Sequence, residues 1–319
     1  MNITSFFKLV EIRTKVASVL PFIFGSLYTL YAFDTFSPYN ALIMFCSMLL
    51  FDMTTTAINN YIDYKKAILK QGYGFEVHNA MVHYQLNPTL VKIIIFIMLA
   101  ISTALGLYLV YLTNIVVLFL GMFCFAIGVL YTYGPIPISR TPFGEIFSGV
   151  VMGLVLTFIS IYIHIFDSNF LLFQLNVDTM LLRLDLKELI KIVCTCMPFV
   201  FTIANIMLAN NICDIKEDIA NKRYTLPIYI GRKKALLLWN LNYYGAYLFI
   251  LFSILKGYLP WICLVCLITF IPVKHNIDYF NLKQSKAETF VYAIQNFLLI
   301  SSSLIVSLII GLFINYHVY

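Results

Sequence analysis

The chain has 319 residues, of which 61% are hydrophobic and only 11% are charged, and its mean hydropathy is +0.88. A soluble domain carries about a quarter of charged residues, so this chain cannot cover a surface exposed to water. The net charge of +6 would suit nucleic acid, but the basic residues cluster between apolar segments, as in membrane proteins. Composition therefore excludes a soluble domain, disfavours nucleic-acid binding and predicts an all-α integral membrane protein.

Nine segments are long and apolar enough to cross a bilayer as helices, which takes about 20 residues each. We expect them to form one polytopic domain, residues 1–319, as a bundle around a central cavity. In chain order the predicted spans are 16–33, 40–62, 91–112, 114–133, 145–166, 189–212, 235–255, 258–273 and 289–316. The first lacks an A-x-A-like cleavage site, so we interpret it as a retained span and not as a signal peptide.

The distribution of Lys and Arg predicts the orientation of the bundle. The N-terminal segment and the connections on its side carry 17 of these residues, whereas the opposite side carries 4. Positive charges stay on the cytoplasmic side of a membrane. We therefore expect the N-terminus in the cytoplasm and the C-terminus outside.

A polar motif, NNICDIKEDIANKRYTLP, follows the sixth predicted span. On one helix Asn210, Asn211, Asp214 and Asp218 would share a stripe, here called the second stripe. Carboxylates four residues apart repel each other, and burial near a bilayer adds to that cost, so we expect positive partners. An ion pair from Asp218 to Lys222 or a charged helix end at the cytoplasm would explain the motif without any function.

The end of the second span carries an echo of this motif. Asn59, Asn60 and Asp63 share a stripe there, here called the first stripe, and Asp52 lies eleven residues before Asp63 on the same face. A carboxylate inside a membrane indicates a functional site, although hydrogen bonds to the threonines that follow Asp52 are an alternative. The repetition at two cytoplasmic helix ends favours a pseudo-symmetric arrangement.

If the two stripes face each other across a cavity, they combine acidic and amide oxygens with basic side chains. Such oxygens suit Mg²⁺, which completes its shell with water and phosphate. The candidate metal ligands are Asp63, Asp214, Asp218, Asn59, Asn210 and Asn211. The candidate diphosphate-binding residues are Asn60, Lys65, Lys66, Lys222 and Arg223. Because a proton relay needs no basic rim, this combination indicates a magnesium–diphosphate site.

Three motifs, in order along the chain, resemble those of the UbiA superfamily of intramembrane prenyltransferases. They are NNYIDYKK from residue 59, YTYGPIPISRTPFGEIFSG from residue 131, and the second stripe with the NKRYTLP that follows. The sequence YTYGP, together with DYKK, is most similar to the motifs of the 1,4-dihydroxy-2-naphthoate prenyltransferase branch of menaquinone synthesis. The resemblance covers essentially the whole chain.

The resemblance implies a Mg²⁺-dependent transfer from a polyprenyl diphosphate to an aromatic acceptor, with Asp63, Asp214 and Asp218 as catalytic residues. For the naphthoate branch it implies loss of the acceptor carboxylate as carbon dioxide, giving a demethylmenaquinone. It also implies a bacterial cell membrane and a site that opens to the cytoplasm. The acceptor-binding candidates by resemblance are Arg13, Tyr131, Tyr133 and Arg140.

One departure from the family pattern concerns the first stripe. The family usually has Asn-Asp-x-x-Asp there with a further aspartate four to six residues later, whereas this chain has Asn60 in the second position and Ala67 and Leu69 in the later region. Asp52 and Glu76 are candidates for a compensating acid. The alternatives to the naphthoate reaction are prenyl transfer to 4-hydroxybenzoate, haem or a glycerol phosphate, an ion-coupled transporter, and an inactive relative that binds isoprenoids.

Overall fold

The computed structural model describes residues 1–66, 79–168, 170–175 and 179–317. Its elements at the N-terminal half are α1 (Ile3–Leu9), η1 (Ile12–Lys15), α2 (Val16–Phe33), α3 (Pro38–Lys66), α5 (Ala80–His83), α6 (Pro88–Leu112), α7 (Ile115–Thr132), η2 (Ile138–Arg140), α8 (Gly144–Ser148), η3 (Gly149–Val155) and α9 (Leu156–Ile165). A hairpin of β1 (Leu171–Leu175) and β2 (Met180–Leu184) follows. The C-terminal half comprises α10 (Leu186–Cys213), α11 (Ile215–Ala220), α12 (Leu226–Ile230), α13 (Arg232–Leu255), η4 (Trp261–Thr269), α14 (Phe270–Leu282) and α15 (Val291–His317).

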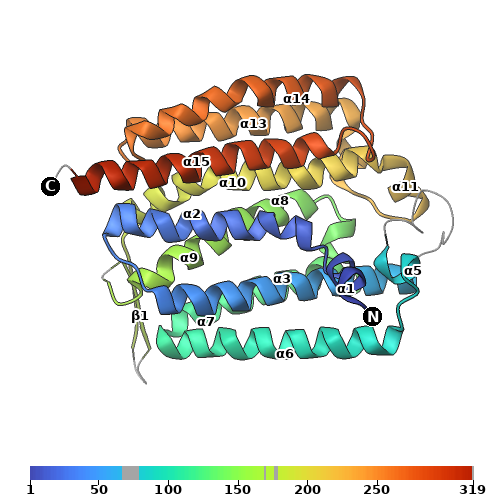
Figure 1. Cartoon of the computed structure of the whole chain (residues 1–319), viewed down its shortest axis with the longest axis horizontal. Helices are drawn as coiled ribbons and strands as arrows, with labels where there is room; N and C mark the ends of the chain where they lie inside the picture. Colours follow the sequence, from blue (N-terminus) through green and yellow to red (C-terminus); the bar gives the residue numbers. More distant parts are fainter. Residues whose placement is uncertain (67–78, 169, 176–178, 318–319) are drawn as a thin grey trace.

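The long helices run side by side, and the two termini lie at opposite ends of the bundle (Figure 1). Within the described residues nine helical segments have the length and hydropathy of membrane spans, which confirms the predicted fold class. The short helices α1, α5 and α11 gather at the end where the chain begins, here called the motif end, and both α3 and α10 finish there (Figure 1). Opposite ends for the two termini agree with an odd number of spans.

Side-chain caps fix where several of the spans begin. The Asn87 side chain accepts hydrogen bonds from the first turn of α6, which has proline at its first position. Asn114 caps α7 in the same way, and only Thr113 and Asn114 separate α6 from α7. Asp185 caps α10. Because asparagine and aspartate satisfy the free N–H groups of a first turn, these residues fix where the helices begin, and the short connection makes α6 and α7 a tight helical hairpin.

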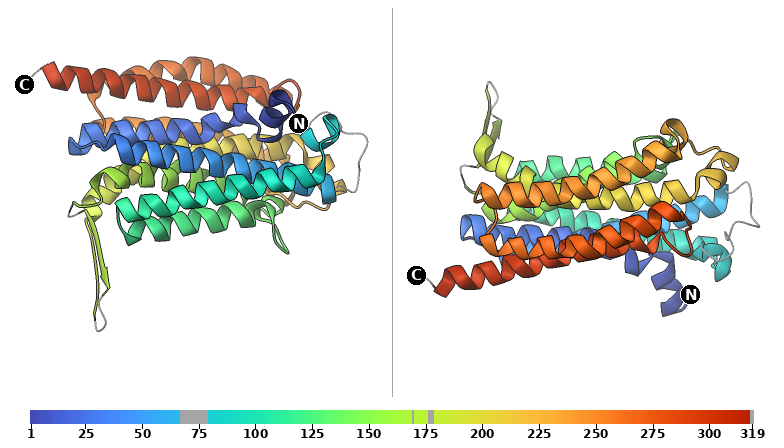
Figure 2. Two further views of the ribbon diagram at one scale, coloured as in Figure 1. Left: turned by 60° about the horizontal axis from the view of Figure 1, so that its bottom comes forward. Right: turned by 90° about the horizontal axis from the view of Figure 1, so that it is seen from above.

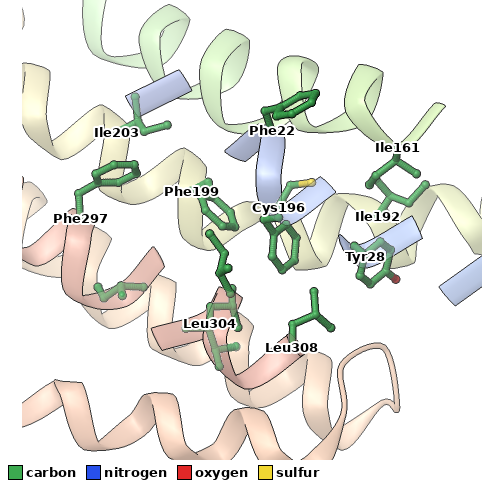
Figure 3. Close-up of a cluster of buried hydrophobic side chains, with 14 of the residues drawn as sticks. Phe22, Tyr28, Ile161, Ile192, Cys196, Phe199, Ile203, Phe297, Leu304 and Leu308 are labelled. Carbon is green, nitrogen blue, oxygen red and sulfur yellow. The ribbon is translucent and has the colours of Figure 1, made fainter. Parts of the chain in front are cut away.

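The main hydrophobic core lies where α2, α9, α10 and α15 meet (Figure 3). Helix α10 is the most deeply buried span, with 61% of its most apolar segment inside the protein. The core residues labelled in Figure 3 are Phe22, Tyr28, Ile161, Ile192, Cys196, Phe199, Ile203, Phe297, Leu304 and Leu308. The second stripe therefore ends a helix that the rest of the bundle holds on several sides.

Two glycines bring the fifth span against α10. A Cβ atom at Gly149 would lie 2.6 Å from the carbonyl oxygen of Val200, and one at Gly153 would lie 2.5 Å from its backbone nitrogen. Residues without side chains at a spacing of four allow membrane helices to approach this closely. The backbone forms a π-helical stretch, η3, over the same residues. This contact fixes the position of the fifth span relative to the second stripe.

Two elements differ from the expected pattern. The connection between the fifth and sixth spans folds as the antiparallel hairpin β1–β2, which extends beyond the helical bundle at the end opposite α1 (Figure 2). The eighth span continues to Leu282, beyond the predicted end at residue 273. The last turns contain polar residues, and a buried polar side chain there has a hydrogen-bond partner in a neighbouring helix. The Asn276 amide donates to Asn296 Oδ1 of α15 at 2.8 Å.

Replacing Gly153 with leucine tests the close contact between the fifth and sixth spans. The new side chain would overlap the backbone at Val200, and overpacking costs about 1–3 kcal/mol or more, so we expect a lower temperature of unfolding in detergent. Gly121→Ala is the matched control, because nothing lies within 4 Å of a Cβ atom at that position. Equal unfolding temperatures for Gly153→Leu and the wild type would contradict the described packing.

Candidate active site

The second stripe crosses a break between two helices. Helix α10 ends at Cys213, and Asp214 has φ −95° and ψ 8°, outside the helical region. Helix α11 starts directly afterwards, and the N–H of Asp218 still donates to the carbonyl of Asp214 at 2.8 Å. The chain therefore bends at Asp214 without unwinding, and the two aspartates stay one turn apart at the motif end.

Asp218 is buried and has a cationic partner. Its Oδ1 atom lies 3.3 Å from Nε of Arg223, and its Oδ2 atom accepts a hydrogen bond of 3.0 Å from the Thr225 hydroxyl. Burial raises the pKa of Asp218, while Arg223 and then Thr225 act in the opposite direction. Arg223 holds this buried carboxylate in place of the Lys222 pairing that the sequence offered as an alternative.

The turn after α11 explains why Arg223 and not Lys222 meets Asp218. Lys222 is exposed and has a positive φ of 54°. This left-handed residue reverses the chain, so that the N–H of Arg223 donates to the carbonyl of Asp218 at 2.8 Å. The same turn leaves the Lys222 side chain at the surface of the motif end.

Asp214 pairs with a lysine from another part of the chain. Its Oδ2 atom contacts Nζ of Lys286, which lies in the connection between α14 and α15. Asp214 is only 8% exposed, so its charge needs a partner within the protein. The sequence did not identify Lys286, because 72 residues separate it from Asp214 and no spacing rule joins them.

A buried glutamate, Glu145, completes the neighbourhood of the second stripe. It opens α8, and its Oε1 atom accepts a hydrogen bond of 2.8 Å from the Asn211 amide. Its Oε2 atom and Asn211 Oδ1 are buried and have no hydrogen-bond partner among the residues that the structure describes. Buried oxygens of this kind fit a site that takes a cation or a hydrogen-bond donor. The Gly-Glu pair in the middle motif was the only sequence signal for this residue.

The middle motif lies against the turn that follows the second stripe. The carbonyl of Arg140 accepts a hydrogen bond of 3.1 Å from the N–H of Tyr224, and Arg223 Nη2 reaches the carbonyl of Ser139 at 3.5 Å. The Tyr131 hydroxyl lies 3.7 Å from where a Cβ atom of Gly144 would stand. Tyr133, by contrast, is 60% exposed. Of these acceptor candidates the structure therefore places the backbone of Arg140 beside the turn that follows the second stripe and Tyr131 beside Gly144, and it leaves Tyr133 on the surface.

One residue of the first stripe, Asn60, binds the N-terminal segment. Asn60 is buried, and its amide donates to the carbonyl of Leu9 at 3.1 Å and to Glu11 Oε1 at 3.2 Å. We therefore do not include Asn60 in the diphosphate site that the sequence predicted for it. Asn59 and Asp63 are half-buried on α3.

The basic residues after the first stripe are only partly described. Lys65 is exposed, with its Nζ atom 6.0 Å from the centre of the Tyr61 ring. The side chain of Lys66 and the whole of Glu76 lie outside the described residues. Lys65 thus stays available at the surface of the motif end, where a charged ligand would arrive.

Asp52 is the partner of a buried lysine in the bundle. Its Oδ1 atom lies 2.7 Å from Nζ of Lys15, and its Oδ2 atom accepts a hydrogen bond of 2.6 Å from Ser18. At 1.5 Å per residue it stands about 16 Å from Asp63 along α3, too far to share one metal ion. The structure thus uses Asp52 to join α2 to α3, and not as the compensating acid predicted from sequence. Arg13 is exposed in η1.

The donor set suits a hard cation that needs few protein ligands. Among the described residues no group of three or more His, Cys, Asp or Glu side chains is placed to hold a metal ion unaided. Mg²⁺ commonly takes only one or two carboxylates and keeps water or substrate phosphate on its other positions. The carboxylates of Asp214 and Asp218 and the unpartnered oxygens of Asn211 and Glu145 fit that requirement.

Two surface cavities lie away from this site. One, of about 360 Å³, is bordered by α1 and the start of α6, with Asn2 and Asn87 among its lining residues. The other, of about 270 Å³, lies near Tyr31 and Trp261. Neither is lined by residues of the two stripes.

Comparisons with known proteins agree with this architecture. A curated relative, the 1,4-dihydroxy-2-naphthoate octaprenyltransferase of Bacillus subtilis (strain 168), is 29% identical over 260 residues, covering 80% of this chain and 75% of the relative. A UbiA homolog from Aeropyrum pernix K1 in its apo form has a TM-score of 0.69 at 20% identity, covering 92% of this chain and 98% of that one.

A second solved structure, a UbiA homolog from Archaeoglobus fulgidus bound to GPP and Mg²⁺, has a TM-score of 0.67 at 13% identity, covering 97% of this chain and 99% of that one. At these identities the two structures show a shared fold. The model of the UbiA prenyltransferase family matches residues 18–301. Since this match spans most of the chain, the protein belongs to the UbiA prenyltransferase family and is an enzyme of that family.

Proposed function

We propose that this enzyme transfers a polyprenyl group from a polyprenyl diphosphate to 1,4-dihydroxy-2-naphthoate, with loss of carbon dioxide, to give a polyprenyl-1,4-dihydroxynaphthalene, which is the reduced (quinol) form of a demethylmenaquinone. The observation that carries the proposal is the second stripe, where buried Asp214 and Asp218 pair with Lys286 and Arg223 beside the unpartnered oxygens of Asn211 and Glu145. The activity of the Bacillus subtilis relative supports the choice of acceptor.

In this proposal the residues of the motif end bind and orient the diphosphate. Asp214 and Asp218 would hold Mg²⁺, with Asn210, Asn211, Asn59 and Asp63 as further oxygen ligands. Arg223, Lys222, Lys65 and Lys66 would neutralise the outer phosphate oxygens. Bound Mg²⁺ would supply positive charge to the departing diphosphate.

The transfer needs no nucleophile from the protein. The bond between the allylic carbon and the diphosphate oxygen breaks, and its electron pair leaves with the diphosphate. The ring carbon that carries the carboxylate forms the new carbon–carbon bond. The bond to the carboxylate then breaks, which releases carbon dioxide and returns its electron pair to the ring. The apolar bundle keeps water from the cation-like prenyl carbon.

The acceptor would enter beside the middle motif. Tyr131 lies beside Gly144, and the backbone of Arg140 is bound to Tyr224, the residue after Arg223, so a ring held by them would be close to a diphosphate held by Arg223. Arg13 would meet the acceptor carboxylate from the start of the bundle. We further propose that the site opens to the cytoplasm of a bacterial cell, because 17 of the 21 Lys and Arg residues fall in the N-terminal segment and in the connections on its side of the predicted bundle.

An ion-coupled transporter fits these observations less well. Transport sites lie near the middle of the membrane, whereas Asp214 and Asp218 stand at the end of α10, with lysine and arginine as partners. The carboxylate that does lie deeper, Asp52, already pairs with Lys15. A diphosphate site therefore accounts for more of the charged residues.

Purified enzyme in detergent, given a polyprenyl diphosphate, 1,4-dihydroxy-2-naphthoate and Mg²⁺, is expected to form the prenylated, decarboxylated product, detected by mass spectrometry. Removal of Mg²⁺ by a chelator is expected to stop the reaction. Parallel reactions with 4-hydroxybenzoate, haem and a glycerol phosphate test the acceptor. Product from one of these and none from the naphthoate would replace the proposed acceptor, and no product from any would refute the proposal.

Asp214→Asn and Asp218→Asn test the metal role of the second stripe. Each removes a negative charge from the site, so we expect kcat to fall by about 100-fold or more, as when a charge-stabilising group is lost. Asp278→Asn is the control, because Asp278 is an exposed partner of Lys274 in α14. Turnover at the wild-type level in both stripe variants would exclude the proposed role.

Glu145→Ala tests whether Glu145 positions Asn211. Without the hydrogen bond to Glu145 Oε1 the Asn211 amide is free to turn, so we expect the Mg²⁺ concentration for half-maximal rate to rise about tenfold. Glu145→Gln keeps an acceptor for Asn211 and should lie nearer the wild type. Glu188→Ala, at the other end of α10, serves as the control, since Glu188 pairs with nearby Lys191. An unchanged Mg²⁺ response in Glu145→Ala would contradict this positioning.

A further inference from the structure

The connection between α14 and α15 brings a cation from the C-terminal part of the chain into the candidate site. It lies at the motif end, beside the end of α10 (Figure 1). Lys286 from this connection pairs with Asp214 Oδ2. Lys286 also acts electrostatically on the carboxyl groups of Glu217 and Asp218. One ammonium group therefore acts on three carboxyl groups, those of Asp214, Glu217 and Asp218.

The connection is built to hold its shape. The Thr289 hydroxyl donates to the carbonyl of Lys283 at 2.9 Å, and the same oxygen accepts from the N–H of Ser285 at 2.9 Å. The Gln284 amide donates to the carbonyls of Phe280 and Asn281 at the end of α14, at 2.7 and 2.9 Å. These bonds fix the backbone on both sides of Lys286. Little backbone entropy is therefore lost when the lysine is held beside the site.

The contact differs from an ordinary ion pair on a surface. The Asp214 side chain is 10% exposed, whereas that of Lys286 is 40% exposed. The carboxylate is thus fixed and buried, while the ammonium approaches from the open side on a flexible stem. A cation at Asp214 Oδ2 occupies an oxygen that a metal ion would need. Lys286 and a metal ion would therefore compete for Asp214.

We infer that Lys286 is an exchangeable counter-ion of the active site. In the empty enzyme it neutralises Asp214. When metal and a diphosphate enter, the metal takes Asp214, and the Lys286 ammonium moves to an oxygen of the diphosphate. This inference rests on the proposed function, and it adds the connection between the eighth and ninth spans to the residues that bind the donor.

Binding measurements on the purified full-length enzyme test this inference without turnover. The probes are Mn²⁺ alone, followed by electron paramagnetic resonance, and inorganic pyrophosphate at saturating Mg²⁺, followed by calorimetry. For Lys286→Ala we expect Mn²⁺ to bind about threefold to fivefold more tightly, the range of a partly exposed ion pair. Pyrophosphate should bind about tenfold more weakly, because one charge-assisted hydrogen bond is lost.

Opposite changes in the two affinities separate this role from a merely structural one. Lys286→Arg should restore both affinities towards the wild type, and Lys286→Gln serves if the alanine variant unfolds. Lys283→Ala is the matched control, because Lys283 lies in the same connection but pairs with exposed Glu288. Its two affinities should equal those of the wild type.

Two results would overturn the inference in different ways. If the wild type binds both probes and Lys286→Ala changes neither affinity, or weakens both, the exchange is wrong while the proposed function stands. If the wild type binds neither Mn²⁺ nor pyrophosphate, both the inference and the proposed function fail.

Discussion

Buried carboxylates at the end of a membrane helix need cationic partners, and this requirement determines which segments meet at the motif end. Asp214 and Asp218 lose most of their contact with water at the end of α10, and an unpaired charge in such a place is very costly. Two separate segments supply the cations: Arg223 comes from the turn after α11, and Lys286 comes from the connection before α15. The charges that a diphosphate enzyme would need are therefore also the contacts that bring these segments together at one end of the bundle.

Close helix packing extends the site to the middle motif. Gly149 and Gly153 let the fifth span touch the backbone of α10, and one turn before Gly149 the same span carries Glu145. The contact between helices thus places Glu145 against Asn211. Packing deep in the bundle and the orientation of an amide at the motif end are linked, because consecutive turns of the same helical span carry the glutamate, in α8, and the glycines, in η3.

The spans and the second motif could be predicted from the sequence because their signals are local. Hydropathy located nine spans, and the spacing of Asp214 and Asp218 indicated a shared face. The partners could not be predicted in the same way. Lys286 is 72 residues from Asp214, and Asn211 is 66 residues from Glu145, so only the packing of helices brings each pair together.

The two halves of the repeated motif have diverged in use, and their partners show how. In the second motif, Asn211 donates a hydrogen bond from its amide to the carboxylate of Glu145. In the first motif, Asn60 occupies the matching position, but its amide binds the backbone of Leu9 and the carboxylate of Glu11. An asparagine that anchors the N-terminal segment can replace an aspartate without leaving a buried charge unpaired. The absence of an aspartate at position 60 thus has a structural reason, and the two buried aspartates of the repeated motif, Asp214 and Asp218, both belong to the second stripe.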